Sequence, residues 1–152
     1  MSAGADLAEI LVLLGVRVMS KKMQRVRTAI DPFEPFAISQ AIAVGEWLFV
    51  SGQAALDDQG QLIGEGDFQA QAEAAFDCLA KVLSAAHSGL EDVVKVTLFL
   101  TDISYFPKVV ELRKRYFTEP YPADTIVEVS KLGLPGLMFE IEAIAVRGAG
   151  SK

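Results

Sequence analysis

The chain has 152 residues and a formal net charge of −6, which is typical of one acidic domain of ordinary size. Such a chain is poorly suited to nucleic acid, because that affinity depends on Lys and Arg residues that neutralise phosphates. One cysteine, Cys78, and one histidine, His87, exclude an internal disulfide and a metal site built from Cys and His. The mean hydropathy of +0.33 predicts surplus apolar surface, which a homo-oligomer would cover.

Residues 1–23 differ from the rest and are predicted to be an N-terminal appendage, for which a short amphipathic helix is one candidate form. The apolar run Ala8–Val18 is too short to cross a membrane. It also lacks the basic start and the small-residue cleavage site of a signal peptide. We therefore expect a cytoplasmic protein without a membrane segment, in which residues 24–152 form a single domain.

The first half of this domain is predicted to be strands and loops. Alternation predicts a strand at Arg25–Ile30, and two prolines make Asp31–Pro35 a loop. A second strand pattern covers Ile42–Val50 and is interrupted at Gly45-Glu46, where a hairpin turn fits. The polar segment Asp57–Gly66 is predicted to be a surface loop.

A long helix is predicted to begin at Asp67, whose carboxylate is suited to cap the first turn. Gly89 is expected to end it in a left-handed conformation. His87, in the last turn, is expected to cap the helix with its side chain, with catalysis the less favoured alternative. Cys78 is expected to be a buried small side chain. The apolar stripe of the helix is Phe68, Ala72, Ala75, Phe76, Leu79, Leu83 and Ala86.

The second half predicts a strand at Val93–Leu100, a helix at about Ser104–Thr118, and strands at Thr125–Val129 and Met138–Val146. The order β-β-α-β-α-β-β favours an α+β fold with two helices on one face of a mixed sheet. Oligomerisation would cover the other face.

Glu140 and Glu142 are separated by one residue in a predicted strand, so they share one face. A carboxylate in an apolar strand lies at a sheet edge, pairs with a cation, or moves protons. Residue type alone favours the edge or paired interpretation. No Gly-rich phosphate loop, zinc spacing or nucleophile elbow is present.

Between Arg25 and Arg147 the chain carries an ordered set of short motifs. They are Val50-Ser51-Gly52-Gln53, Gly66-Asp67-Phe68, Asp92-Val93-Val94-Lys95-Val96-Thr97, Leu100-Thr101-Asp102, Tyr116-Phe117, Pro122-Ala123, Val127-Glu128-Val129 and Glu140-Ile141-Glu142-Ala143-Ile144-Ala145-Val146-Arg147. In this set the chain resembles the reactive intermediate (imine/enamine) deaminase family, or Rid family, also called YjgF-like or endoribonuclease L-PSP.

The resemblance implies a fold like that of chorismate mutase from Bacillus and a homotrimer with ligand sites in clefts between subunits. It implies hydrolysis, without a cofactor, of reactive imines made by pyridoxal-phosphate enzymes. Its catalytic glutamate, which activates water, falls on Glu140. Its substrate-binding positions fall on Ser51, Gly52, Phe36, Asp124 and Ile126. Active members carry tyrosine where this chain has Phe36.

The arginine that anchors the substrate carboxylate in the family falls on Asp124. Loss of one charged anchor costs about 2–5 kcal/mol, and a like charge facing the substrate adds more. We therefore expect a hydrolase of altered specificity, with Glu140 as general acid and base. The alternatives are a non-catalytic trimer that binds a small amine in an acidic cleft and, least favoured, a ribonuclease. A substitute arginine from a neighbouring subunit would have to be Arg113, Arg115 or Arg147.

Overall fold

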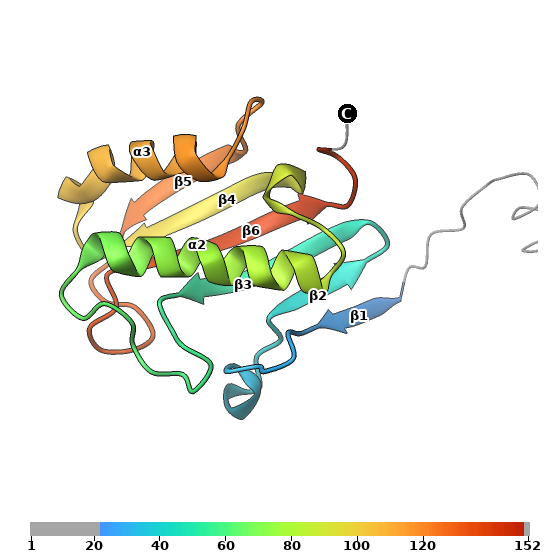
Figure 1. Ribbon diagram of the computed structural model, residues 1–152, viewed down its shortest axis with the longest axis horizontal. Helices are drawn as coiled ribbons and strands as arrows, with labels where there is room; N and C mark the ends of the chain where they lie inside the picture. The colour runs from blue at the N-terminus through green and yellow to red at the C-terminus, as the bar shows by residue number, and fades with distance from the viewer. Residues whose placement is uncertain (1–21, 151–152) are drawn as a thin grey trace, which may run out of the picture.

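One six-stranded mixed sheet carries both long helices on a single face, as Figure 1 shows, so the predicted fold class is confirmed. The computed structural model describes residues 22–150. The predicted appendage, 1–23, therefore lies almost wholly outside the described residues. The strands are β1 (Met23–Val26), β2 (Ala41–Val44), β3 (Trp47–Ala54), β4 (Val93–Leu100), β5 (Ala123–Glu128) and β6 (Phe139–Val146), and the helices are α2 (Phe68–Ala85) and α3 (Phe106–Tyr116).

The strands lie in the order β1-β2-β3-β6-β4-β5, and only the pair β4–β5, which α3 connects, is parallel. The predicted turn at Gly45-Glu46 is confirmed, and it divides the second strand pattern into β2 and β3. Three strands therefore precede α2. The first strand ends at Val26 rather than Ile30, because the Thr28 amide donates to Gln40 Oε1 (2.7 Å) instead of to the sheet.

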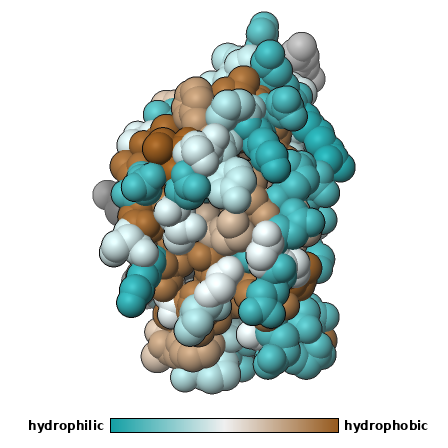
Figure 2. Space-filling view, turned by 90° about the vertical axis from the view of Figure 1, so that its left-hand side faces the viewer, coloured by the Kyte–Doolittle hydropathy of each residue, from teal (hydrophilic) through white to brown (hydrophobic). Residues whose placement is uncertain are grey.

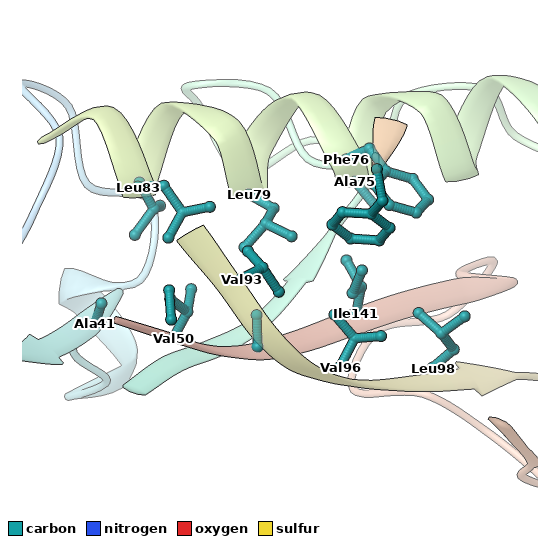
Figure 3. Packing of buried hydrophobic residues seen from close by; sticks show 14 of the residues in the cluster. Ala41, Val50, Ala75, Phe76, Leu79, Leu83, Val93, Val96, Leu98 and Ile141 are labelled. Atoms are coloured by element: carbon teal, nitrogen blue, oxygen red, sulfur yellow. The ribbon is translucent and has the colours of Figure 1, made fainter. Parts of the chain in front are cut away.

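The apolar stripe of α2 packs on the sheet as the sequence predicts. Figure 3 shows Phe76, Leu79 and Leu83 directed from the helix towards the strands below, which present Val96 and Ile141. Each of these five side chains is at most 1% exposed. Burial of one such side chain stabilises the fold by about 1.5–3 kcal/mol, so this layer holds the sheet and the helix together.

The two ends of α2 give one confirmed and one wrong prediction. Asp67 caps the first turn by accepting a hydrogen bond from the Ala70 amide (3.1 Å). Gly89 does not end the helix, because its backbone is extended (φ −143°). His87 takes the left-handed conformation instead (φ 56°), and the Ser88 amide donates back to the Leu83 carbonyl (3.0 Å). His87 thus ends the helix through its backbone.

Three further features concern the cysteine, membrane and metal predictions. Cys78 is only partly buried rather than enclosed, and burial raises the pKa of its thiol. Within residues 22–150, no helix is both long and apolar enough to span a membrane. The same part of the chain holds no cluster of three or more His, Cys, Asp or Glu side chains that is arranged for a metal ion.

Asp92 ties the end of the domain to the sheet. Its buried carboxylate accepts hydrogen bonds from Ser88 Oγ (2.7 Å) and from the Gly150 amide (3.0 Å). Burial works against ionisation of Asp92, but these hydrogen bonds and those of neighbouring amides outweigh it and lower its pKa. The carboxylate form is therefore the one that holds residues 148–150 in place.

We predict that Asp92→Ala lowers the free energy of unfolding at pH 7 by about 1–3 kcal/mol, because it leaves buried donors without an acceptor. The folded-state pKa of Asp92 lies below its ordinary value of 3.8, so this contribution is present above pH 3.8 and is lost as the pH falls through the folded-state pKa. Urea unfolding of both chains at pH 7 and pH 3 measures this. Asp58→Ala, at an exposed carboxylate, is the control. An equal loss of unfolding free energy in Asp92→Ala at both pH values would contradict the prediction.

Candidate functional site

A pocket of about 290 Å³ opens where the first residues of β6 lie against the end of β3. Apolar side chains form most of its wall, and Ser51 and Glu140 are its polar side chains. Glu140 is the one ionisable group among the described lining residues. The complete lining is Phe33, Phe36, Ile38, Ser51, Gly52, Ala54, Leu56, Gly133, Leu134, Leu137 and Glu140.

The floor of the pocket is a β-bulge in β3. Val50 pairs with Ala143 and Gln53 pairs with Ile141, so two residues, Ser51 and Gly52, stand opposite one residue of β6. The Ser51 amide donates to the Gln40 carbonyl (3.0 Å), and its hydroxyl donates to the Ser39 carbonyl (2.7 Å). These hydrogen bonds hold the bulged residues away from β6, which makes room for the Glu140 side chain.

Gly52 is in close contact with Glu140. A Cβ atom at position 52 would lie 1.9 Å from Glu140 Oε1 and 2.7 Å from Cδ, far inside contact distance. The carboxylate therefore occupies the space that any other residue at position 52 would fill.

Glu140 and Glu142 lie on the same face of β6, as predicted, because Ile141 and Ala143 face α2. β6 is an interior strand, so the edge interpretation is wrong for this residue, and no ion pair joins Glu140 to another of residues 22–150. Burial raises the pKa of the half-buried Glu140 carboxyl, and the neighbouring charge of Glu142 raises it further. Such a carboxyl is suited to gain and lose a proton.

Asp124 and Ile126 do not line this pocket. They pair with Val96 and Leu98 of β4 and so face the helices, whereas Glu140 faces the other side of the sheet. The structure therefore brings together Phe36, Ser51, Gly52 and Glu140, and it leaves Asp124 and Ile126 apart within one chain.

Arg113 of α3 neutralises Asp124 inside the same chain. Its Nε lies 2.6 Å from Asp124 Oδ2, and its Nη2 donates to Oδ1 (2.7 Å). The other two candidate arginines are also engaged, Arg115 with Glu73 (2.6 Å) and Arg147 with the backbone carbonyls of residues 45 and 86. Within one chain, the guanidinium group next to Asp124 is therefore that of Arg113.

Apart from Phe36, the apolar wall is the part of the site that the sequence did not reveal. Phe33 and Phe36 come from the loop before β2, and Leu134 and Leu137 from the loop before β6. The first segment overlaps the predicted loop Asp31–Pro35 and the second lies between two predicted strands, so apolar residues outside regular elements were the available signal. Their convergence depends on the pairing of β3 with β6, which the sequence does not specify.

Comparisons with known proteins find one family throughout. The family model described as Endoribonuclease L-PSP matches residues 26–147. A RutC family protein of Pyrococcus abyssi is 38% identical over 85% of this chain and 99% of its own length. The human 2-iminobutanoate/2-iminopropanoate deaminase is 36% identical over 86% of this chain and 95% of its own. The crystal structure of RidA from an Antarctic Psychrobacter is similar with a TM-score of 0.74 and 36% identity, covering 81% of this chain and 98% of that one.

We predict that Gly52→Ala displaces the Glu140 carboxylate and lowers stability by about 1–3 kcal/mol, because the added methyl group overlaps Oε1. The titration of Glu140, followed by NMR of its side-chain carboxyl carbon, should change with it. Gly133→Ala is a matched control in the same pocket, since a Cβ there would meet nothing within 4 Å. An unaltered Glu140 titration in Gly52→Ala would show that the close contact does not position the carboxylate.

Proposed function

This chain belongs to the family described as Endoribonuclease L-PSP, which includes the RutC and Rid proteins, and we propose that it hydrolyses the C=N bond of a small imine or enamine-derived imine. The observation that carries the proposal is Glu140, a half-buried carboxyl with a raised pKa in an apolar pocket. The name of the human relative, a deaminase of two imino acids, supports it.

In the proposed reaction, the Glu140 carboxylate takes a proton from a water molecule as its oxygen attacks the imine carbon. With the imine nitrogen protonated, this attack gives a neutral carbinolamine, and Glu140 returns the proton to its nitrogen. As the C–N bond breaks, Glu140 takes the hydroxyl proton, so ammonia and a carbonyl compound leave. One group performs all of these transfers, so a pKa closer to neutrality favours the cycle. The apolar wall strengthens the electrostatic interactions of the carboxylate by excluding water.

We propose a specificity that differs from that of relatives with an arginine at position 124. The described lining residues include no Lys, Arg or His, so one subunit offers a substrate carboxylate no cation in this pocket. Asp124 does not make the site more acidic, because Arg113 pairs with it. The apolar side chains of Phe33, Phe36 and Leu134 favour a substrate with an apolar group at this wall.

We further propose that the protein is a homotrimer whose subunits meet on the helix-free face of the sheet, which leaves the pocket in a cleft between subunits. This face carries exposed apolar side chains from strands on both sides of β6, among them Trp47 (48% exposed), Phe49 (47%) and Val127 (36%). In Figure 2, polar residues gather on the right, while brown apolar surface lies towards the centre and left. Such a face in water favours association.

A non-catalytic trimer is the second candidate, and the absence of a cation among the described lining residues favours it. In that case the pocket would bind a neutral or amine ligand beside Glu140 without turnover. A ribonuclease fits the site less well, since the same lining offers no Lys, Arg or His for phosphate. The single cysteine leads us to propose the cytoplasm as the compartment.

We predict that Phe49→Asp dissociates the trimer, because it places a charge in the centre of the proposed apolar interface. Sedimentation equilibrium measures the mass. Phe106→Asp is the matched control, since Phe106 is similarly exposed (42%) but lies on α3, away from the open face. A trimer that persists in Phe49→Asp, or a native chain that is monomeric, would overturn this arrangement.

The function is tested by ammonia release from freshly generated imines, including 2-iminobutyrate, 2-aminoacrylate and imines without a carboxylate. We expect the native chain to hydrolyse at least one imine with an apolar substituent. Glu140→Gln should reduce that rate by about 100-fold or more, because it removes the general acid and base.

The role of position 124 needs a double substitution. Asp124→Arg alone would place two guanidinium groups together, so Arg113→Gln is combined with it to leave one free cation. Within one chain position 124 lies on the other face of the sheet from Glu140, so the new arginine can act only on the pocket of a neighbouring subunit in the proposed trimer. There we expect the double variant to hydrolyse 2-iminobutyrate about thirty-fold faster or more, the equivalent of about 2 kcal/mol for one charged anchor. If neither protein releases ammonia from any imine, the binding function replaces the hydrolase.

A further inference from the structure

Gln71 is a fully buried polar side chain that the proposed reaction does not use. It lies in the second turn of α2 and is 0% exposed. A buried amide is costly unless its donors and acceptor find partners. Here all of them do. Nε2 donates to the carbonyls of Gly64 (3.1 Å) and Gly136 (2.9 Å), and Oε1 accepts from the Met138 amide (2.8 Å).

The two carbonyls belong to glycines in tight turns. Gly64 and Gly136 have positive φ angles of 69° and 81°. A Cβ atom at Gly64 would lie 2.8 Å from Ala70 Cβ, and one at Gly136 would lie 2.8 Å from Leu62 Cδ2. The Gln71 side chain thus holds two turns in which a side chain larger than glycine would clash with neighbouring atoms. In Figure 1 the loops that contain them lie beside each other at the start of α2.

Both loops lead directly to the pocket. Leu134 and Leu137 line it, and Leu137 packs with Leu62 in a small apolar cluster beside the pocket. Met138 is the residue before β6, and its carbonyl accepts a hydrogen bond from the Thr101 amide (3.2 Å), which joins it to the end of β4. Glu140 follows two residues later. The position of its carboxylate therefore depends on where Met138 is held.

We infer that Gln71 is a positioning residue, which sets the Gly133–Met138 segment and through it both the apolar wall and the first residues of β6 that carry Glu140. The catalytic part of this inference rests on the proposed function. The buried Gln71 amide then fixes the distance between the apolar wall, which holds the substrate, and the Glu140 carboxyl, which reacts with it.

The first test compares kcat and KM of the native chain with those of Gln71→Met, which keeps the length of the side chain and removes its hydrogen bonds. Gln69→Met is the matched control, because Gln69 lies on the same helix and, among the described residues, its side chain donates only to Glu73 (2.8 Å). At a temperature where all variants are folded, we expect kcat of Gln71→Met to fall by about 10–100-fold, since small displacements of a reacting group are this costly. KM should rise, because the apolar wall moves as well.

Gln71→Glu adds a rescue experiment. At this buried position beside two carbonyl oxygens the acid is favoured in its protonated form, which keeps an acceptor for the Met138 amide and has one donor for the two glycine carbonyls, so kcat should lie between those of the native chain and Gln71→Met. A stabilising role alone would lower the unfolding temperature and leave kcat and KM of the folded enzyme unchanged. That result would overturn the inference.

A second readout does not need activity. Hydrogen exchange at the Met138 amide and the NMR titration of Glu140 report the segment and the carboxyl directly. We expect faster exchange and a shifted Glu140 titration in Gln71→Met, and native behaviour in Gln69→Met. An inactive native chain would reject the proposed hydrolase while these measurements still test the positioning. Native exchange and titration in Gln71→Met would reject the positioning, whatever the activity.

Discussion

The alternation of side chains along β6 determines where chemistry can occur in this fold. Phe139, Ile141 and Ala143 face α2 and complete the core, so Glu140 and Glu142 must face the other side of the sheet. Because β6 is an interior strand, these carboxylates cannot reach solvent at a sheet edge. The free-energy cost of burying a carboxylate is reduced where the bulge in β3 opens a pocket. Glu140 lies there, half-buried and with a raised pKa.

The site is consequently built from rigid strands on one side and from loops on the other. The strands supply Ser51, Gly52 and Glu140, which are fixed by the register of β3 with β6. The loops supply the apolar wall, and buried polar contacts rather than regular pairing hold them in place. This division suits a site that needs a fixed reacting group and a wall that differs between relatives with different ligands.

Sequence reasoning succeeded where local patterns decide the structure. The stripe of α2, its Asp67 cap and the shared face of Glu140 and Glu142 follow from periodicity and from the chemistry of helix ends. The end of α2 was predicted wrongly because glycine is the usual left-handed residue. His87 takes that conformation here, two residues before Gly89, where the backbone hydrogen bonds of the last turn require it.

Contacts between distant segments could not be predicted in the same way. Arg113 and Asp124 were both singled out, yet the sequence does not show that α3 packs beside β5 and lets them pair within one chain. The sequence did not predict a buried role for Gln71, because a glutamine near the start of a helix usually faces solvent. Only the tertiary structure shows that two loop carbonyls and the Met138 amide meet it.

The strand order also has a consequence for folding during synthesis on the ribosome. β6 is the last strand in the sequence, yet it lies between β3 and β4 in the middle of the sheet. Until residues 139–146 leave the ribosome, the β1–β2–β3 hairpins and the β4–α3–β5 unit share no strand pairing, and both expose an unpaired apolar edge. Folding of the whole domain therefore waits for the synthesis of β6, and the strand that completes the sheet is also the one that carries Glu140.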